Sequence, residues 1–221
     1  MLAVAGGKGG CGKTTTALGI GRALDGDAVV VDTDRDMPNL HAMAGVDREP
    51  MAAAGAEPQR VDGGLSVLPA PSPTTHDAAV TTLLDGVANR TDARVVVDCP
   101  GGAGPDAAAP LAAATRVVLV STACAPALRD ATKIAAMARA LGCRVAGTVL
   151  TRTRVVPPGV EALFDCPVLG TVPDVSEPVL TADPVRAAYA DVARTLESDT
   201  LETPDTRQKD PQKGQIGLDR F

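Results

Sequence analysis

Residues 6–15 read Gly-Gly-Lys-Gly-Gly-Cys-Gly-Lys-Thr-Thr, and the pattern G-x-x-x-x-G-K-T runs from Gly7 to Thr14. Glycines let a backbone bring its N–H groups against phosphate oxygens with no Cβ in the way. Lys13 supplies a compact charge for the β- and γ-phosphates of a nucleotide, and the Thr14 hydroxyl is a hard oxygen ligand suited to Mg²⁺. The pattern predicts a nucleotide site in which Lys13 is catalytic and Thr14 binds the metal. The residues expected to bind the nucleotide are Gly7, Gly9, Gly10, Cys11, Gly12, Lys13, Thr14 and Thr15.

The sequence on either side fits such a loop. The apolar residues 2–5 precede it as a strand should, and residues 14–24 follow with apolar side chains at helical spacing. A helix beginning there would direct the positive end of its dipole at a bound phosphate. The alternative, a glycine-rich turn with an incidental lysine, leaves this strand–loop–helix order unexplained.

Two β-branched runs further along the chain each end in aspartate. Residues 28–31 lead to Asp32, with Asp34 two positions later, and residues 94–97 lead to Asp98. Buried parallel strands are continuous apolar runs, and their carboxyl ends meet at the edge of the sheet where ligands bind. Carboxylates just beyond a strand end can approach one phosphate-bound cation. For the first pair, the alternative is an acidic loop that caps the next helix.

These motifs resemble those of the MinD/ParA family of dimerising ATPases. The run G-K-G-G-C-G-K-T-T, with a second lysine at Lys8, is similar to the family's deviant Walker A motif. The order D-x-D followed by N-L, from Asp32 to Leu40, resembles switch I. The order D-x-P-G, from Asp98 to Gly101, resembles the end of the Walker B strand and switch II.

The resemblance implies a role for each of these residues. Lys8 would reach across a dimer interface to the partner's ATP, and Asp34 would orient or deprotonate the attacking water. Asp32 and Asp98 would hold Mg²⁺ through water. The N–H of Gly101 would sense the γ-phosphate. ATP and Mg²⁺ are therefore the expected cofactors.

Two later segments resemble the family's adenine contacts. L-T-R at residues 150–152 is similar to the adenine-side motif, and G-T-V-P-D at residues 170–174 resembles G-x-I-P-x. The resemblance implies that Arg152 and Pro173 contact the base. The chain departs from the usual family pattern at Arg35, Asp36 and Thr151.

Apolar runs that alternate with helical patterns, with acids and glycines at strand ends, predict an α/β fold. We expect a doubly wound, mostly parallel sheet with helices on both faces. Residues 1–197 should form one domain, and the polar residues 198–221 a disordered tail. Further elements are expected as strands at 65–69, 115–121 and 144–152, helices at 77–89, 125–141 and 184–196, and a loop with a short helix at 45–64.

Composition bears on compartment and partners. The net charge of −6 argues against DNA binding, which depends on neutralising phosphates. Five cysteines without a C-x-x-C pair indicate reduced thiols. We find no leader pattern and no run of about 18 apolar residues, so we expect a cytoplasmic protein. Ile216, Leu218 and Phe221 give the tail a faint apolar stripe, but Gly214 and Gly217 interrupt it, and we expect no membrane binding there.

The leading hypothesis is a MinD-like ATPase that binds Mg·ATP, dimerises face to face and hydrolyses ATP slowly. It would act as a switch that positions a cellular assembly, such as division, chromosome, plasmid, chemosensory or motility machinery, through an unidentified protein partner. One alternative is a scaffold that binds ATP with little hydrolysis. Another is an iron–sulfur carrier of the Mrp type, for which Cys99 has no matching partner motif. A third is an amidotransferase-like ligase, for which no acceptor-substrate domain is visible.

Overall fold

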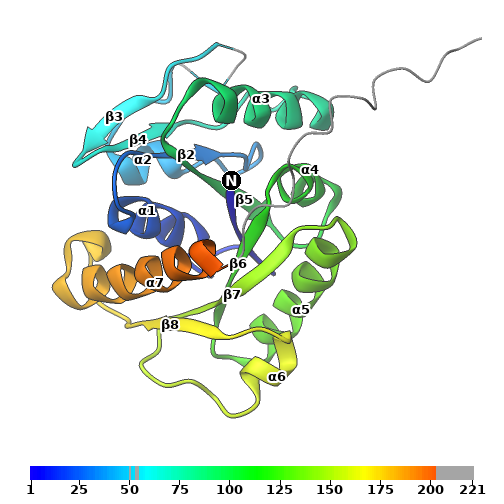
Figure 1. The fold of residues 1–221 in the computed structure, drawn as a ribbon, viewed down its shortest axis with the longest axis vertical. Helices are drawn as coiled ribbons and strands as arrows, with labels where there is room; N and C mark the ends of the chain where they lie inside the picture. Colours follow the sequence, from blue (N-terminus) through cyan, green and yellow to red (C-terminus); the bar gives the residue numbers. More distant parts are fainter. Residues whose placement is uncertain (50, 53–54, 203–221) are drawn as a thin grey trace, which may run out of the picture.

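A central sheet has the strand order β3-β4-β2-β5-β1-β6-β7-β8 (Figure 1). The computed structural model describes residues 1–49, 51–52 and 55–202. Neighbouring strands pair in parallel except β3 and β4, which are antiparallel. The strands are β1 (Leu2–Gly6), β2 (Ala28–Asp32), β3 (Gln59–Asp62), β4 (Leu65–Leu68), β5 (Arg94–Gly101), β6 (Arg116–Thr122), β7 (Arg144–Thr151) and β8 (Val168–Val172).

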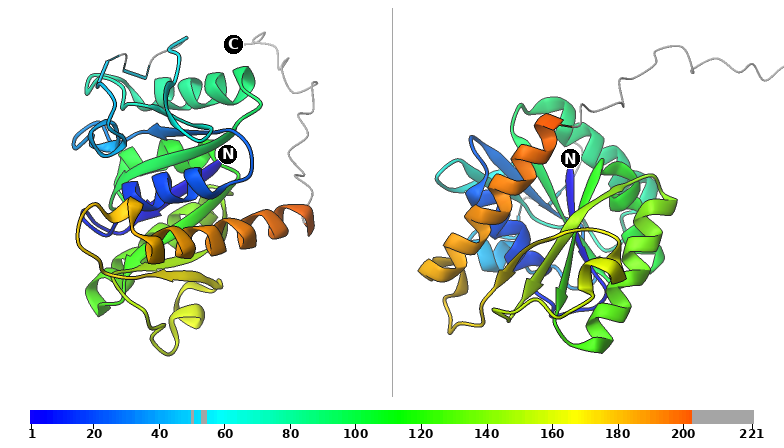
Figure 2. Two further views of the ribbon diagram at one scale, coloured as in Figure 1. Left: turned by 90° about the vertical axis from the view of Figure 1, so that its left-hand side faces the viewer. Right: turned by 60° about the horizontal axis from the view of Figure 1, so that its bottom comes forward.

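Helices cover both faces of this sheet (Figure 2). One layer contains α1, α2 and α7, and the other contains α3, α4, α5 and α6. The helices are α1 (Lys13–Ala23), α2 (Leu40–Ala44), α3 (Asp77–Arg90), α4 (Pro105–Ala113), α5 (Ala125–Ala140), α6 (Val160–Phe164) and α7 (Asp183–Glu202), with a 3₁₀ turn η1 at Val179–Thr181. The predicted fold class is confirmed.

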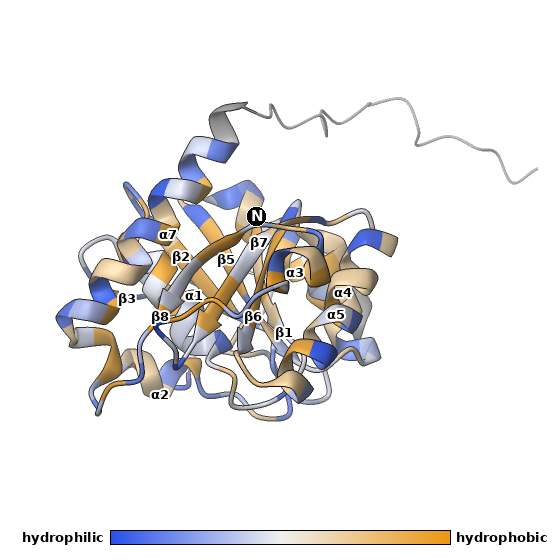
Figure 3. Cartoon of the chain, turned by 90° about the horizontal axis from the view of Figure 1, so that it is seen from below, coloured by the Kyte–Doolittle hydropathy of each residue, from blue (hydrophilic) through white to orange (hydrophobic). Residues whose placement is uncertain are grey.

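Alternate side chains of each central strand enter different cores. In β1, Leu2 and Val4 pack with α1 and α7, whereas Ala3 and Ala5 pack with the opposite helix layer. Because side chains alternate across a strand, a strand that is covered on both faces must be apolar throughout. Figure 3 shows this distribution, with apolar residues on the strands and polar residues on the outer side of α7.

Several elements differ from the sequence-based expectation. The segment expected to be a loop with a short helix contains β3, whose residues are alternately half-buried and exposed and which pairs with β4. Its polar sequence QRVD gives little apolar signal, and the strand forms because β4 offers it a sheet edge. Helical periodicity did not predict α4 or α6. The helix α4 consists mostly of alanine and proline, and α6 has only five residues, so neither shows a clear apolar pattern.

The last helix continues past its expected end at Leu196 as far as Glu202. The boundary expected at residue 197 therefore falls inside α7. The rest of the expected tail, residues 203–221 with its apolar stripe, lies outside the described residues. Across the part of the chain that the structure describes, each helix is too short or too polar to cross a bilayer.

Arginines at the starts of three strands hold the last turns of α7. Arg94 forms an ion pair of 2.8 Å with Glu197, and Arg116 and Arg144 both pair with Asp199. The Arg144 guanidinium lowers the pKa of the Asp199 carboxyl. These contacts join elements that are distant in the sequence, so helical periodicity could not show where α7 ends.

Candidate nucleotide-binding site

The loop at residues 7–12 connects the end of β1 to the start of α1. Gly12 is the N-cap of α1 and has φ +90°, a left-handed value that favours glycine. A Cβ on Gly7 would lie 2.3 Å from the carbonyl carbon of Asp130, so the loop packs directly on α5. A Cβ on Gly9 or Gly10 would meet no described heavy atom within 4 Å. The loop is therefore fixed on one side and accessible on the other.

The side chain of Lys13 is held over this loop. Lys13 is only 8% exposed, and its ammonium donates a hydrogen bond of 3.4 Å to the carbonyl of Lys8. A Cβ on Gly101 would lie 3.3 Å from Nζ of Lys13 and 3.1 Å from the nitrogen of Gly9. The N–H of Gly102 donates to the carbonyl of Gly6 at 3.1 Å. The predicted switch II segment thus contacts both the loop and its lysine.

The end of β7 supports the loop from the other side. The Thr151 hydroxyl donates to the carbonyl of Cys11 at 2.8 Å, and the guanidinium of Arg152 donates to the carbonyl of Gly10. Cys11 itself is buried under the loop. Pro173 is buried just after β8, the strand that pairs with β7. Thr151 and Gly102 are supports that the motifs did not identify, because their bonds go to backbone atoms of remote segments.

Asp32 and Asp98 lie side by side at the ends of the neighbouring strands β2 and β5. Both are buried, with exposures of 0% and 1%. The carboxylate of Asp32 accepts hydrogen bonds from the N–H groups of Asp34 at 2.9 Å and Leu40 at 3.3 Å. Oδ1 of Asp98 has no hydrogen-bond partner in the part of the chain that the structure describes. Buried polar atoms are nearly always bonded, so this oxygen indicates a missing ligand.

Burial shifts both carboxyl groups toward the protonated form. It raises the pKa of Asp32 to about 6. Burial, together with the nearby charge of Asp32, raises the pKa of Asp98 to about 8, although the neighbouring Thr14 hydroxyl and the charge of Lys13 lower it in part. Two buried carboxylates are costly unless a cation neutralises them.

The donor set fits a hard cation that takes few protein ligands. The Thr14 hydroxyl, at the start of α1, is 3.0 Å from Oδ1 of Asn39. Within the described residues, no group of three or more histidine, cysteine, aspartate or glutamate side chains could hold a metal ion. Mg²⁺ commonly binds through one or two carboxylates together with phosphate and water, so Asp32, Asp98 and Thr14 suit it. Asn39 lies in the segment that resembles switch I, but that resemblance did not predict its contact with Thr14.

Asp34 and Lys8 lie at the accessible side of the site. Asp34 is half-buried, and its carboxylate accepts the N–H of Met37 at 3.0 Å. Lys8 is exposed. Pairing with Lys133 lowers the pKa of Asp130 at the start of α5, and the charge of Lys8 adds to this effect. Lys8 therefore lies near the first turns of α5. Thr15 follows in the first turn of α1 and is half-buried.

Cys99 does not belong to the accessible surface. It is 0% exposed, its thiol donates to the carbonyl of Val97, and burial raises its pKa. A buried, protonated thiol is a poor position for a cluster ligand.

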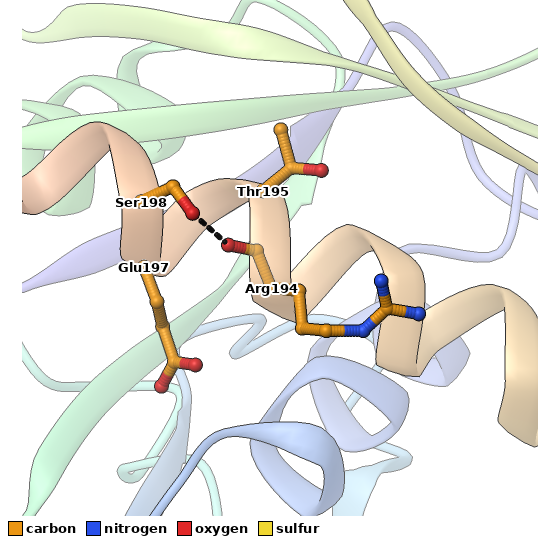
Figure 4. Close-up of a pocket in the computed structure, with 4 residues that line it drawn as sticks. All are labelled: Arg194, Thr195, Glu197 and Ser198. Carbon is orange, nitrogen blue, oxygen red and sulfur yellow. Dashed lines mark hydrogen bonds between the residues drawn. The ribbon is translucent and has the colours of Figure 1, made fainter.

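A surface hollow elsewhere is separate from the site. It is lined by Arg194, Thr195, Glu197 and Ser198 of α7 (Figure 4). Glu197 pairs with Arg94 at the start of β5, so the hollow lies near the amino ends of the strands, whereas the loop lies at their carboxyl ends.

A family model described as the CobQ/CobB/MinD/ParA nucleotide binding domain matches residues 2–181. The chain belongs to this family. The match includes the loop, both buried aspartates, Arg152 and Pro173, so the CobQ/CobB/MinD/ParA assignment rests on the whole site and on most of the sheet.

Two relatives and one solved structure align with this chain along most of their own length. An uncharacterized ATP-binding protein of Methanocaldococcus jannaschii is 27% identical over 194 residues, which cover 78% of this chain and 74% of that protein. The septum site-determining protein MinD of Synechocystis is 24% identical, with 91% and 90% covered. The structure of MinD from Pyrococcus horikoshii, complexed with Mg-ADP, is 22% identical and superposes with a TM-score of 0.78, covering 91% of this chain and 96% of that one.

Proposed function

We propose that this protein is a MinD-like ATPase that works as a dimeric switch. It binds Mg·ATP, pairs face to face with a second copy, and hydrolyses ATP slowly to release the pair. The observation that carries this proposal is the buried Asp32–Asp98 pair, with one oxygen that lacks a partner, beside Lys13 and the glycine loop.

The cofactors follow from this arrangement. Lys13 and the N–H groups of residues 9–14 bind the phosphates. Thr14 binds Mg²⁺ directly, and Asp32 and Asp98 hold it through water. Mg²⁺ neutralises phosphate charge when bound, which lowers the barrier to phosphoryl transfer. A MinD structure with Mg-ADP and a cobyrinic acid a,c-diamide synthase structure with an ATP analog and magnesium support this assignment.

Asp34 and Lys8 carry the hydrolytic step. Asp34 orients or deprotonates the attacking water from the accessible side of the loop, and Gly101 senses the γ-phosphate. Lys8, exposed near α5, binds the phosphates of the partner's ATP. A cationic side chain supplied in trans contributes roughly 10³–10⁵ in rate in comparable enzymes, so turnover depends on dimerisation.

The cellular role is the spatial positioning of an assembly in the cytoplasm, through one protein partner. A structure of a MinC:MinD cell division protein complex from Aquifex aeolicus supports a partner of this type. The net charge of −6 supports a role without DNA binding. Arg152 and Pro173 contact the adenine once ATP is bound, and the bond of Arg152 to the carbonyl of Gly10 already holds its side chain against the nucleotide loop.

The test measures ATP turnover and molecular mass with and without Mg·ATP for the wild type, Lys8→Ala and Asp34→Ala. We expect an ATP-dependent dimer in the wild type, its loss in Lys8→Ala, and a trapped dimer without turnover in Asp34→Ala. Equal turnover by three monomeric proteins would overturn the trans-lysine mechanism. An ATP-dependent dimer without measurable turnover in any variant would instead indicate a scaffold.

A further inference from the structure

Arg35 follows Asp34 in the switch I segment, and its side chain leaves that segment to bind two other parts of the fold. The side chain is only 12% exposed. One guanidinium nitrogen donates to the carbonyl of Thr75, in the loop before α3. The other donates to Oδ1 of Asp106, in the first turn of α4, at 2.5 Å.

The planar fork of an arginine makes such a double contact well defined. Each bond is charge-assisted, and both fix the guanidinium plane. A lysine would offer three freely rotating donors on a compact charge, without the fixed plane that sets the geometry of both bonds. The carboxylate of Asp106 also lies at a helix N-terminus, where negative charge is favourable. Arg35 therefore connects switch I to the loop before α3 and to the first turn of α4.

The anchored segment is otherwise short and irregular. Residues 33–39 join β2 to α2 and form no regular structure. Asp34 is placed by its own N–H bond to Asp32 and by the bond of Met37 to its carboxylate. These local bonds fix the shape of the loop, whereas the bonds of Arg35 fix its position relative to the body of the protein.

The anchor also lies next to switch II. Asp106 follows residues 101–104, the segment that contacts the loop and Lys13. A shift of α4 would therefore move the partner of Arg35 and the γ-phosphate sensor together.

We propose that Arg35 is a positioning residue: its bonds to Thr75 and Asp106 hold Asp34 at a fixed place relative to switch II and the nucleotide loop. This inference rests on the proposed hydrolytic role of Asp34. In this proposal Arg35 acts through its neighbour Asp34, because its guanidinium is bound to Thr75 and Asp106.

The test compares Arg35→Ala, Asp106→Ala, the double variant and a matched control, Asp183→Ala. Asp183 also lies in the first turn of a helix and pairs with an arginine, Arg186, at 2.6 Å, but on the surface of α7. Two quantities are measured: hydrogen exchange at the N–H groups of Met37 and Leu40 without nucleotide, and kcat and KM for ATP.

We expect Asp106→Ala to speed exchange at both amides by about tenfold, the effect of losing one hydrogen bond to a charged group. The kcat should fall by about tenfold while KM changes less than twofold. Arg35→Ala should do more, because it also loses the bond to Thr75, and the double variant should resemble Arg35→Ala. Asp183→Ala should match the wild type in every measurement.

Unchanged exchange in Asp106→Ala, or effects of the two single variants that simply add, would overturn the positioning role. The exchange measurement needs no activity. A wild type without turnover would count against the proposed function, while the exchange result would still decide whether Arg35 positions the segment.

Discussion

At the scale of single residues, the carboxylates of Asp32 and Asp98 are the most informative groups in the molecule. Taking a carboxylate out of water is unfavourable, and two adjacent ones repel each other. The structure nevertheless buries both completely, and one oxygen of Asp98 has no partner among the described residues. Perturbed carboxyl groups beside a glycine loop mark a functional site, because packing alone would favour apolar residues there.

This burial predicts a pH effect on stability. The pKa of Asp98 rises from 3.8 to about 8 on folding. The folded protein thus keeps a proton that the unfolded chain releases, so the contribution of Asp98 to stability falls as the pH rises from about 4 to about 8. Asp98→Asn, which is neutral throughout, should gain about 3–4 kcal/mol relative to the wild type between pH 5 and pH 8, because each pH unit in this range contributes about 1.4 kcal/mol. The Tm difference without nucleotide should grow by roughly 6–16 °C over the same range.

The same variant should lose stabilisation by Mg·ATP, because a neutral amide is a poor partner for Mg²⁺. Asp183→Asn, which changes an exposed carboxylate on the surface of α7, serves as the control and should keep the stabilisation by Mg·ATP. A Tm difference between Asp98→Asn and the wild type that stays constant with pH would contradict the assignment.

At the scale of elements, α7 supports the helix that carries the site. Gly19 of α1 faces the ring of Tyr189, and the Thr16 hydroxyl is 3.1 Å from the Tyr189 hydroxyl. Because α1 begins at Lys13, its packing on α7 sets the position of the lysine that we expect to be catalytic. A glycine in a helix normally costs stability, so Gly19 is there for the close approach of the ring.

Gly19→Ala should therefore weaken both stability and nucleotide binding. A Cβ at this position would lie 2.2 Å from Cδ2 of Tyr189, so the ring or the helix must move. Overpacking of this kind costs about 1–3 kcal/mol, which lowers Tm by roughly 2–12 °C. Thermal unfolding and ATP titration measure the two effects.

Gly86→Ala in α3 is the matched control for this substitution. Its Cβ would meet no described heavy atom within 4 Å, so it should raise stability by about 0.5–1 kcal/mol. If Gly19→Ala proved as stable as Gly86→Ala, the packing of α7 would not constrain α1.

At the scale of the whole molecule, the strand order brings the site together. β1, β2 and β5 are neighbours or next neighbours in the sheet. The loop follows β1, Asp32 is the last residue of β2, and Asp98 pairs with it in the carboxyl half of β5. Ligands of open α/β sheets bind at this edge. The arginines that hold α7 lie at the amino ends of β5, β6 and β7. The candidate nucleotide site and the ion pairs that hold α7 therefore lie at opposite ends of the strands.

Ligand binding at this edge should stabilise the whole fold. With Mg·ATP at about 100 times its Kd, linkage gives about 2.7 kcal/mol, or roughly 5–11 °C in Tm. Lys13→Ala should lose most of this shift, and removal of Mg²⁺ with a chelator should reduce it in the wild type. Ser198→Ala, in the hollow on α7, should keep the full shift. An equal shift in Lys13→Ala would show that ATP binds elsewhere.

Local patterns predicted the loop, the buried strands and the fold class, because each depends on residues that are close in the sequence. The glycine loop was recognisable since its chemistry requires particular residues at fixed spacing. Continuous apolar runs predicted β2, β5 and β6 for the same reason. The roles of Lys8, Asp34 and the adenine contacts remain predictions, because they depend on a nucleotide and a second copy of the chain.

Other features could not be read from local patterns. The strand β3 has little apolar signal and forms on the edge that β4 provides. The bond of Thr151 to Cys11 spans 140 residues of the chain. Arg35 appeared only as a departure from the family pattern until the fold placed Asp106 beside it.

The sequence by itself predicted which groups carry the chemistry and determined the central strands of the sheet, because motif spacing and apolar periodicity are local properties. The tertiary structure alone decided which of these groups meet and how each is held. Burial raised the pKa of the two aspartates, the arginines at the strand starts extended α7, and the packing of α4 gave Arg35 its partner. Each of these effects arises between residues that are distant in the chain, and their energies depend on distance and solvent exclusion in the folded molecule.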